Sequence, residues 1–531
     1  MSDPLVASLK SLLITQDTAA APSEGTPSQI TADTVTQTTI TSADLSATTN
    51  SNYVWHVFEA LDGDCRGQMV LCTAFNEASD QATVTSFRVA SPTTTQFKHW
   101  EFSWPVAVAT DDGTTTTTIS DLRTETNNAW LHYYMLSLAG ENTDLKNITD
   151  FTASSDTFTH DAFDNGTLIG DMTMPVQPLQ PDSVEVVVDA GTPLEREIIT
   201  DSLDPEGIVV GAIEEATVTF SAELRGLASA ASDGTTALPP AEMHVALSSV
   251  FTETLNTGDN VASWSGPTLT VDDGTAFSEY TMALLNGEVF GITAIATNDL
   301  TTQTGHIVNT PVADDVVYGG ANYKPKDSGW TSSSFLCWYG EELLLALTGG
   351  LPEIGVSIEG NAIAHYNCTY QCVGGFAMDV TKPHDDIYDT STPLVGKGNV
   401  SRVVFDGTVL DGDVLSCEFT LLDAPVKKNA AFTAFENNGG LFYTSRTGSC
   451  TMVVQMEDSE YWQRYRAMQE VDLLVQVGSI ATAAWGCWSP RAQLVEAPEI
   501  SEADGLFQIT LNLRFLRPTT QGQPAYVLAH F

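Results

Sequence analysis

Positive charge is the scarcest feature of this sequence. Its 531 residues include 21 lysines and arginines against 68 aspartates and glutamates, for a formal net charge of −47 at pH 7. A chain so acidic repels phosphates, so electrostatic capture of DNA, RNA or an anionic membrane is not the expected activity. The acidity itself fits two origins, a surface kept soluble in a salty medium or a surface that must keep a polyanion away.

Cysteines and long apolar runs are also sparse. The eight cysteines are too few and too scattered for a disulfide-stapled secreted scaffold. No apolar run approaches the roughly 18 residues that a membrane-spanning helix needs. The opening residues, MSDPLVASLKSLLITQD, lack the basic segment and cleavage site of a signal peptide, which predicts a protein made inside the cell and not exported by that route.

Catalytic motifs are missing as well. The sequence has no GxSxG, Walker loop, HExxH or GxGxxG motif in a usable context. The pairs Glu214-Glu215 and Glu341-Glu342 are chain neighbours, which point to opposite faces of a strand, whereas acid–base catalysis needs carboxylates that converge. We therefore expect no enzyme and no cofactor. A glycoside hydrolase, suggested only by aromatic and acidic residues on a β-rich chain, is the weakest alternative.

One cysteine pair comes closest to a metal site. Cys368 and Cys372 are preceded by His365 and followed by His384. In an apparent strand the two cysteines share one face about 13 Å apart, too far for common coordination. Buried cysteines are the simpler interpretation, and no metal is expected. The Asp-Gly pairs lack the ladder of oxygen ligands of a calcium loop and predict hairpin turns instead.

The first third of the chain divides into two parts. Residues 1–51 are rich in Ser, Thr, Ala and Gln without apolar periodicity, which predicts an extended arm that adds to a neighbouring surface. From 52 to 175, short strand patterns alternate with turn signals, as in a β-sandwich-like domain. Its aromatic residues fit either a core or a groove that stacks on sugars: Trp55, Phe58, Trp100, Phe102, Trp104, Trp130, Tyr133 and Tyr134.

Three prolines mark the next boundary. Pro175, Pro178 and Pro181 should interrupt any ladder or helix, which predicts a Pro-rich linker over 176–190. The remaining residues, 191–531, form two cycles of similar element order, with a division into 191–322 and 323–531. Prolines at 239 and 240 predict the start of a short helix that runs through Val250.

Residues 414–515 carry the clearest pattern. Apolar residues alternate in three runs around a segment, 458–470, in which Trp462, Tyr465 and Arg466 recur at helical spacing. The alternating residues are Leu415, Cys417, Phe419 and Leu421, then Met452, Val454 and Met456, then Phe507, Ile509, Leu511 and Leu513. The pattern predicts a mainly β fold: a twisted antiparallel sheet with one short helix laid on it.

This order of elements resembles the tail tube (major tail) proteins of long-tailed, siphovirus-type bacteriophages. The resemblance rests on the turn Ser445-Arg446-Thr447-Gly448, the helix over 458–470, the late Asp504-Gly505 pair and two upstream segments, 191–196 and 216–226. It covers roughly 191–515. It implies a tail-tube-type β-barrel or sandwich with short helices, beside the N-terminal β-sandwich-like domain.

The resemblance also implies a function. Six tube folds would form a ring, from six copies or, if both cycles are complete tube domains, from three. Stacked rings would form a hollow cylinder through which genomic DNA passes without specific binding. The implied partners are other copies of the chain and other tail proteins. The implied location is the virion, after assembly in the host cytoplasm. The alternative is a glycan- or receptor-binding virion surface protein, suggested by the aromatic N-terminal domain.

Three expectations about parts of the chain follow from the resemblance. Residues 52–175 should decorate the outer surface. The long polar connection over 378–400 should reach an adjacent subunit or ring, with His384, Asp385, Asp386 and Tyr388 as the candidate contact residues. The lumen should carry net negative potential, with Glu359 and Glu418 as candidate lumen-facing acids.

Overall fold

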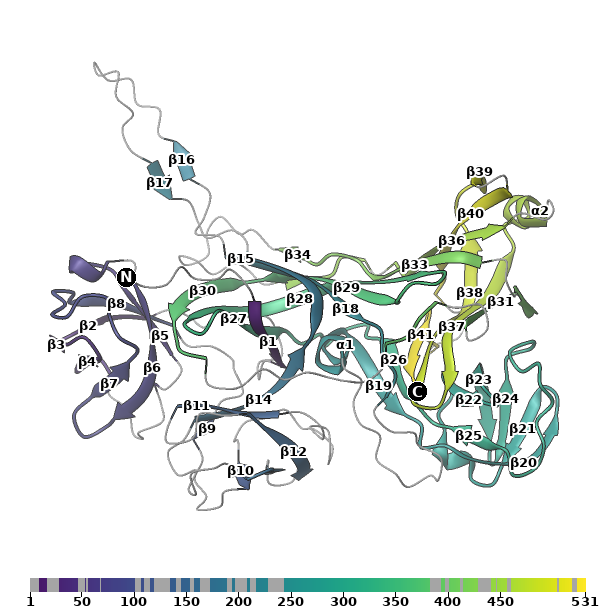
Figure 1. Cartoon of the computed structure of the whole chain (residues 1–531), viewed down its shortest axis with the longest axis horizontal. Helices are drawn as coiled ribbons and strands as arrows, with labels where there is room; N and C mark the ends of the chain where they lie inside the picture. Colours follow the sequence, from purple (N-terminus) through teal and green to yellow (C-terminus); the bar gives the residue numbers. More distant parts are fainter. Residues whose placement is uncertain are drawn as a thin grey trace.

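The computed structural model describes most of the chain. The described residues are 9–16, 28–45, 53, 56–66, 68–100, 107–108, 115–118, 134–139, 145–152, 157–162, 172–188, 193–195, 208–210, 216–227, 243–382, 393–396, 401–410, 414–427, 441–445, 447–455, 460–503, 506–517 and 523–531. In this part the fold is mainly β, as predicted, with two α-helices, α1 (His244–Val250) and α2 (Glu460–Arg466) (Figure 1). Both lie in segments for which the sequence predicts helix.

Seven neighbouring antiparallel strands of a larger continuous sheet, here called the central sheet, cross the middle of the molecule (Figure 1). Its order is β15 (Pro181–Val188), β18 (Ala216–Glu223), β29 (His365–Cys372), the second half of β28 (Leu343–Glu359), β33 (Val414–Leu422), β36 (Ser449–Gln455) and β40 (Leu506–Phe515). Alternate residues of each strand enter one large apolar core. The predicted alternation over 414–515 is thus confirmed for most of its residues, whereas Leu415 and Phe507, at the starts of β33 and β40, are exposed.

The first half of β28 belongs to a second sheet. There it pairs with β27 (Ser333–Tyr339) and β30 (Gly374–Asp379). On the other edge of β27 lies β1 (Leu9–Gln16), followed by β14 (Met172–Leu179), β11 (Tyr134–Ala139) and β12 (Leu145–Thr152). The short strands β9 (Ala107–Val108), β10 (Thr116–Thr118) and β13 (Thr157–His160) pair around them.

The N-terminal part forms a separate seven-stranded sheet. Its order is β2 (Ser28–Thr31), β8 (Gln96–Trp100), β5 (Val57–Ala60), β6 (Met69–Asn76), β7 (Gln81–Val84), β4 (Thr39–Thr41) and β3 (Thr34–Val35), with a 3-10 turn at Gly63–Cys65. Its core is continuous with the second sheet, because Phe58 and Phe97 share one apolar cluster with Trp338 of β27 and Phe376 of β30.

Beyond the central sheet, the C-terminal strands form a twisted layer on which α2 lies. This layer contains β31 (Ser401–Phe405), β32 (Thr408–Val409), β37 (Glu470–Ile480), β38 (Ala483–Leu494) and β41 (Val527–His530). The short strand β39 (Glu499–Ala503) pairs with β40 and extends the central sheet at that edge. Two small strand pairs lie outside these sheets: β16 (Pro193–Glu195) with β17 (Ile208–Val210), and β34 (Val426–Lys427) with β35 (Leu441–Phe442). The first of these projects away from the body (Figure 1).

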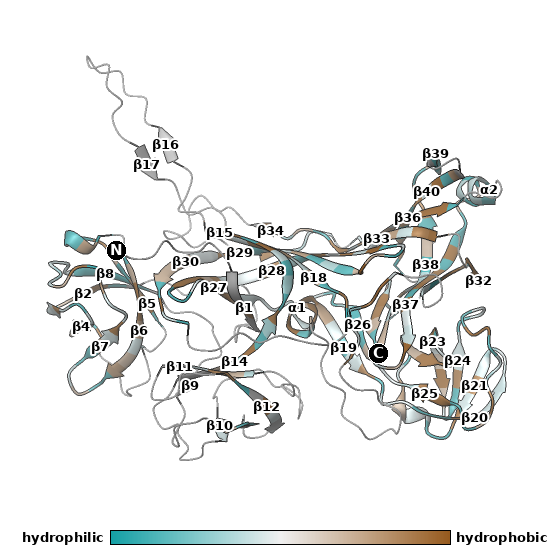
Figure 2. Cartoon of the chain, in the orientation of Figure 1, coloured by the Kyte–Doolittle hydropathy of each residue, from teal (hydrophilic) through white to brown (hydrophobic). Residues whose placement is uncertain are grey.

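A six-stranded closed barrel is inserted between β19 (Phe251–Leu255) and β26 (Ala321–Pro325). Its order is β20 (Asp259–Ser265), β21 (Thr268–Val271), β24 (Asp299–Thr302), β23 (Glu288–Ala296), β22 (Thr281–Leu285) and β25 (Val316–Tyr318), with a 3-10 turn at Gly274–Ala276. The barrel has its own core. A further apolar cluster joins it to the C-terminal layer, through Met282 and Val289 on one side and Trp488 and Phe531 on the other. Strands of both parts carry hydrophobic stretches, drawn in brown in Figure 2.

The proline segment is not a linker over 176–190. Pro175 lies opposite Met135, and Pro178 lies opposite Leu13, inside β14, while β15 begins at Pro181. A proline removes one N–H donor but keeps its carbonyl acceptor, so a strand tolerates it at a position where that N–H is not needed.

Two domain boundaries also differ from expectation. Strand β18, from the first predicted cycle, pairs with β29 from the second, so 191–322 and 323–531 share one sheet and one core. The described parts of residues 1–51 are strands that pair within this chain. Both differences arise from pairings between segments far apart in sequence, which local patterns do not encode.

Candidate functional site: the polar face of the central sheet

One face of the central sheet is built mainly from hydroxyl, amide and carboxylate side chains, with Val187 and Val453 as apolar exceptions. Because strand side chains alternate between faces, every second residue points away from the apolar core. We call this surface the polar face; its residues are half-buried or exposed. Its members are Ser183, Glu185, Thr217, Thr219, Ser221, Glu223, Glu353, Ser357, Glu359, His365, Asn367, Thr369, Gln371, Ser416, Glu418, Thr420, Ser449, Thr451, Asn512 and Arg514.

Hydrogen bonds between strands order these side chains. Asn367 lies between two serines: its Oδ1 accepts a hydrogen bond from Ser221 Oγ at 3.1 Å, and its Nδ2 donates to Ser357 Oγ at 3.2 Å. Beside them, Thr219 Oγ1 donates to Thr369 Oγ1 at 3.3 Å. The donors and acceptors of this region are therefore occupied by one another rather than left to a ligand.

A second set of side-chain hydrogen bonds joins β36 to β40 at the other side of the polar face. Thr451 Oγ1 donates to Asn512 Oδ1 at 3.0 Å, and Asn512 Nδ2 donates to Glu496 Oε2 at 2.8 Å. Both ends of the face thus follow one scheme, in which an asparagine amide joins side chains on its two sides. The result is an ordered polar surface.

The charge of the face is strongly one-sided. The seven strands carry six carboxylates, Asp182, Glu185, Glu223, Glu353, Glu359 and Glu418, against a single arginine, Arg514, and no lysine. Two of the acids have basic neighbours: Asp182 Oδ2 lies 2.8 Å from His365 Nε2, and Glu223 Oε2 lies 2.7 Å from Arg225 Nη2. Among the described residues, Glu185, Glu359 and Glu418 have no ion pair.

Glu359 and Glu418 lie close together on the adjacent strands β28 and β33, toward the end of β28. In the register of β28 and β33, Ser357 is opposite Glu418 and Glu359 is opposite Ser416, so both carboxylates are on the same face and diagonal to each other. Both side chains are exposed. The structure thus places the two acids singled out from sequence on one open, acidic surface.

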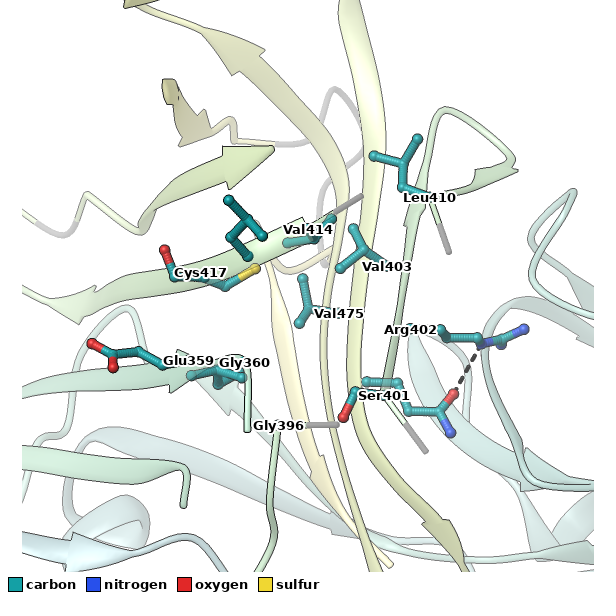
Figure 3. Close-up of a pocket in the computed structure, with 14 residues that line it drawn as sticks. Glu359, Gly360, Gly396, Ser401, Arg402, Val403, Leu410, Val414, Cys417 and Val475 are labelled. Atoms are coloured by element: carbon teal, nitrogen blue, oxygen red, sulfur yellow. Dashed lines mark hydrogen bonds between the residues drawn. The ribbon is translucent and has the colours of Figure 1, made fainter. Parts of the chain in front are cut away.

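A small cavity opens beside Glu359 (Figure 3). Its volume is about 80 Å³, and it lies between the ends of β28 and β33 on one side and β31 and β37 on the other. Val403, Val414 and Val475 make its wall apolar, while Glu359 lies at one margin and Arg402 at the other (Figure 3). Ligand pockets are typically about 300–1,000 Å³. This cavity is therefore a gap between strands and not a cofactor site.

The candidate metal ligands predicted from the sequence do not come together in the structure. Cys368 and Cys372 point into the core, whereas His365 is on the polar face, so the strand separates the histidine from the thiols. No group of three or more potential metal ligands gathers within the described residues. His384, Asp385, Asp386 and Tyr388 lie outside the described residues, as do Arg446, Asp504 and Gly505 of the resemblance.

The aromatic groove suggested for the N-terminal domain is only partly visible. Phe58 is fully buried and Tyr134 is half-buried, so neither forms an exposed stacking platform. The side chains of Trp55, Trp100, Phe102, Trp104, Trp130 and Tyr133 lie outside the described part. No described residue supports a sugar-binding groove.

The structure contains two buried polar networks that the sequence did not predict. His306 Nε2 donates to Asp472 Oδ2 at 2.6 Å, and Trp488 Nε1 donates to Asp472 Oδ1 at 2.7 Å. Elsewhere, His244 Nδ1 lies 2.9 Å from the Tyr323 hydroxyl and 3.1 Å from Glu253 Oε1. His306 and Asp472 are 166 positions apart, and His244 and Tyr323 are 79 apart, so no local signal could have paired them. The two histidines are buried, which makes structural roles the better interpretation.

Comparisons with known proteins do not extend this description. No protein-family model matches the chain, and a search of the curated proteins returned no match. In the described part of the chain, no helix has the length and apolar character required to cross a membrane.

Proposed function

We propose that this chain is a structural virion protein that assembles into stacked rings of a phage tail tube, a conduit for DNA ejection. The observation that carries the proposal is the polar face: a broad, ordered sheet surface whose seven strands carry six carboxylates, one arginine and no lysine. The resemblance of residues 191–515 to tail tube proteins points the same way. On this proposal the polar face lines the lumen, and the partners are other copies and other tail proteins.

The chemistry of the polar face suits a wall past which DNA must move. Duplex DNA carries one phosphate charge for about each 1.7 Å of its axis, and proteins hold it mainly through lysine and arginine. Glu359 and Glu418 repel phosphates. The hydroxyls and amides around Asn367 are already bonded to one another. DNA would therefore pass without being retained.

The edges of the sheet provide a route to self-assembly. Among the described strands, β15 pairs only with β18 at one side, and β39 pairs only with β40 at the other. Open strand edges readily pair with another chain, and a ring turns this hazard into its means of assembly. Sheets of neighbouring copies would then continue into one another around the lumen.

Electron microscopy of the purified protein tests the assembly. The expected result is rings or tubes with an open central channel, in which the polar face faces inward. Compact monomers that persist at high concentration, without rings or tubes, would refute the proposal. Rings whose channel is lined by another surface would refute the assignment of the polar face.

The lining can be tested by charge reversal. The double variant Glu359→Lys/Glu418→Lys should assemble and retain duplex DNA at low salt, and this retention should weaken steeply as salt rises. A matched control is Asp272→Lys/Asp299→Lys, which makes the same charge change at exposed barrel positions. A gel-shift assay on assembled particles compares them. Equal DNA retention by both variants would contradict a special role for the polar face.

A further inference from the structure

Strand β1 occupies an unusual position in the second sheet. It lies between β14 and β27 and pairs with both: Leu12 is opposite Leu179 on one side, and Leu13 is opposite Leu336 on the other. Among the described residues, β14 and β27 do not pair with each other. Leu9–Gln16 therefore fills a slot whose two walls belong to distant parts of the chain.

The slot is closed by apolar packing as well as by backbone pairing. Leu13 is 1% exposed and belongs to the cluster that contains Val176 of β14 and Trp338 of β27. Without β1, two strand edges and part of this cluster would be open. Such a slot accepts an extended segment with an inward leucine, and the structure shows one sequence that fits it.

We propose that the slot is an exchange site between copies, and that in the assembled protein it holds Leu9–Gln16 of a second copy. Every backbone pair of β1 and the packing of Leu13 are then preserved, because the incoming strand has the same sequence. Domain swapping of this kind links subunits at little cost, since it requires no contact that the single chain does not already make.

The connection to the next strand permits the exchange. β1 is followed by β2, which lies in the separate N-terminal sheet. Between them lie residues 17–27, a stretch that spans at most roughly 36–40 Å when fully extended. That reach is of the order of a domain diameter. In a dense assembly, a neighbouring slot within this reach competes effectively with the chain's own slot.

The experiment uses cysteine pairs in the full-length protein. Thr15 and Ser334 are directly opposite each other in β1 and β27, and opposed strand positions lie within disulfide reach. Thr15→Cys/Ser334→Cys, assembled and then mildly oxidised, should give covalent multimers on non-reducing gels. Gln16→Cys/Ser333→Cys provides a second pair in the same register if the first variant folds poorly. The eight native cysteines are all buried, which limits unwanted oxidation.

The control is a cysteine pair between two strands that are expected to remain in the same chain. Thr219 and Thr369 are opposite each other in β18 and β29, with hydroxyl oxygens 3.3 Å apart. Thr219→Cys/Thr369→Cys should therefore oxidise within single chains only. Single-chain disulfides from the β1 pairs in assembled protein would overturn the exchange, and so would the absence of any disulfide there. Rings that form with single-chain links would leave the proposed tube standing while removing the exchange.

Discussion

At the scale of single residues, buried neutral histidines shape the stability of this protein. His56 Nδ1 and His99 Nε2 are 2.5 Å apart in stacked rings, and burial lowers the pKa of His99 to about 4. Burial, reinforced by the neighbouring His99, lowers the pKa of His56 to about 3. At the other end of the chain, burial likewise lowers the pKa of His530 to about 4. The folded protein thus excludes protons that the unfolded chain accepts.

We therefore predict that acid destabilises the fold. An unfolded histidine titrates near 6.5, so as pH falls from about 6.5 to about 4 the unfolded state binds protons that the folded state does not. Each such histidine should remove on the order of 3 kcal/mol over this window, and none of this loss should occur above about pH 7. Urea unfolding measured at several pH values checks the direction.

The variant His530→Gln isolates one contribution. His530 Nδ1 donates to the Arg225 carbonyl, and its Nε2 accepts from the Tyr366 hydroxyl, bonds that an amide can partly replace without titrating. The dependence of unfolding free energy on pH should become shallower between about pH 6.5 and 4. An unchanged slope would contradict the assignment of that proton to His530.

At the scale of elements, the docking of the barrel depends on a buried polar network. Gly291 N–H donates to His306 Nδ1 at 3.0 Å, which leaves Nε2 to donate to Asp472. Gly291 also permits close packing, since a Cβ there would lie 2.7 Å from the Trp488 ring. Nearby, Arg402 Nη2 donates to the His306 carbonyl at 2.7 Å. Charged and neutral bonds together join β23 to β31, β37 and β38.

We predict that Asp472→Asn loosens the barrel. Both carboxylate oxygens accept from ring N–H groups, so an amide must turn its NH₂ toward a donor and leave buried groups unsatisfied. The cost should be about 1–3 kcal/mol or more in unfolding free energy. Denaturant unfolding and limited proteolysis at the barrel junction measure it.

The matched control is Asp299→Asn on the barrel surface. Asp299 Oδ1 accepts from Thr270 Oγ1 at 2.7 Å, and an asparagine carbonyl can accept the same bond. Its effect should be within about 0.5 kcal/mol of zero. If the two variants were equally stable, the network would not hold the barrel in place.

At the scale of the whole molecule, self-repulsion opposes folding. A formal net charge of −47 is spread over 531 residues, and residues 256–320 contain no lysine or arginine at all. Salt screens such repulsion, with a Debye length near 10 Å at 0.1 M and about 3 Å at 1 M. We predict that the melting temperature rises as KCl increases from 0.1 to 1 M. A melting temperature that falls with salt would show that ion pairs outweigh repulsion.

The sequence predicted which strand residues point into the core, because that orientation depends on local periodicity. Cys417, Phe419 and Leu421 alternate into the core as predicted, while Leu415 is 39% exposed because a bulge between Val414 and Ser416 shifts the register. The opposite orientation of His365 and Cys368 also follows from strand parity. The approach of Asp472 to His306, across 166 positions, depends on how the barrel packs. No pattern within either segment encodes that distance.

The barrel is joined to the surrounding sheet through the paired strands β19 and β26. Leu255 and Ala321 are directly opposite each other in β19 and β26, so the chain leaves the surrounding sheet and returns to it at neighbouring points. Residues 256–320 could be gained or lost in a single genetic event without altering the register on either side. Descendants of one ancestor could then differ by this whole module, retaining the central sheet while presenting different domains at the same position.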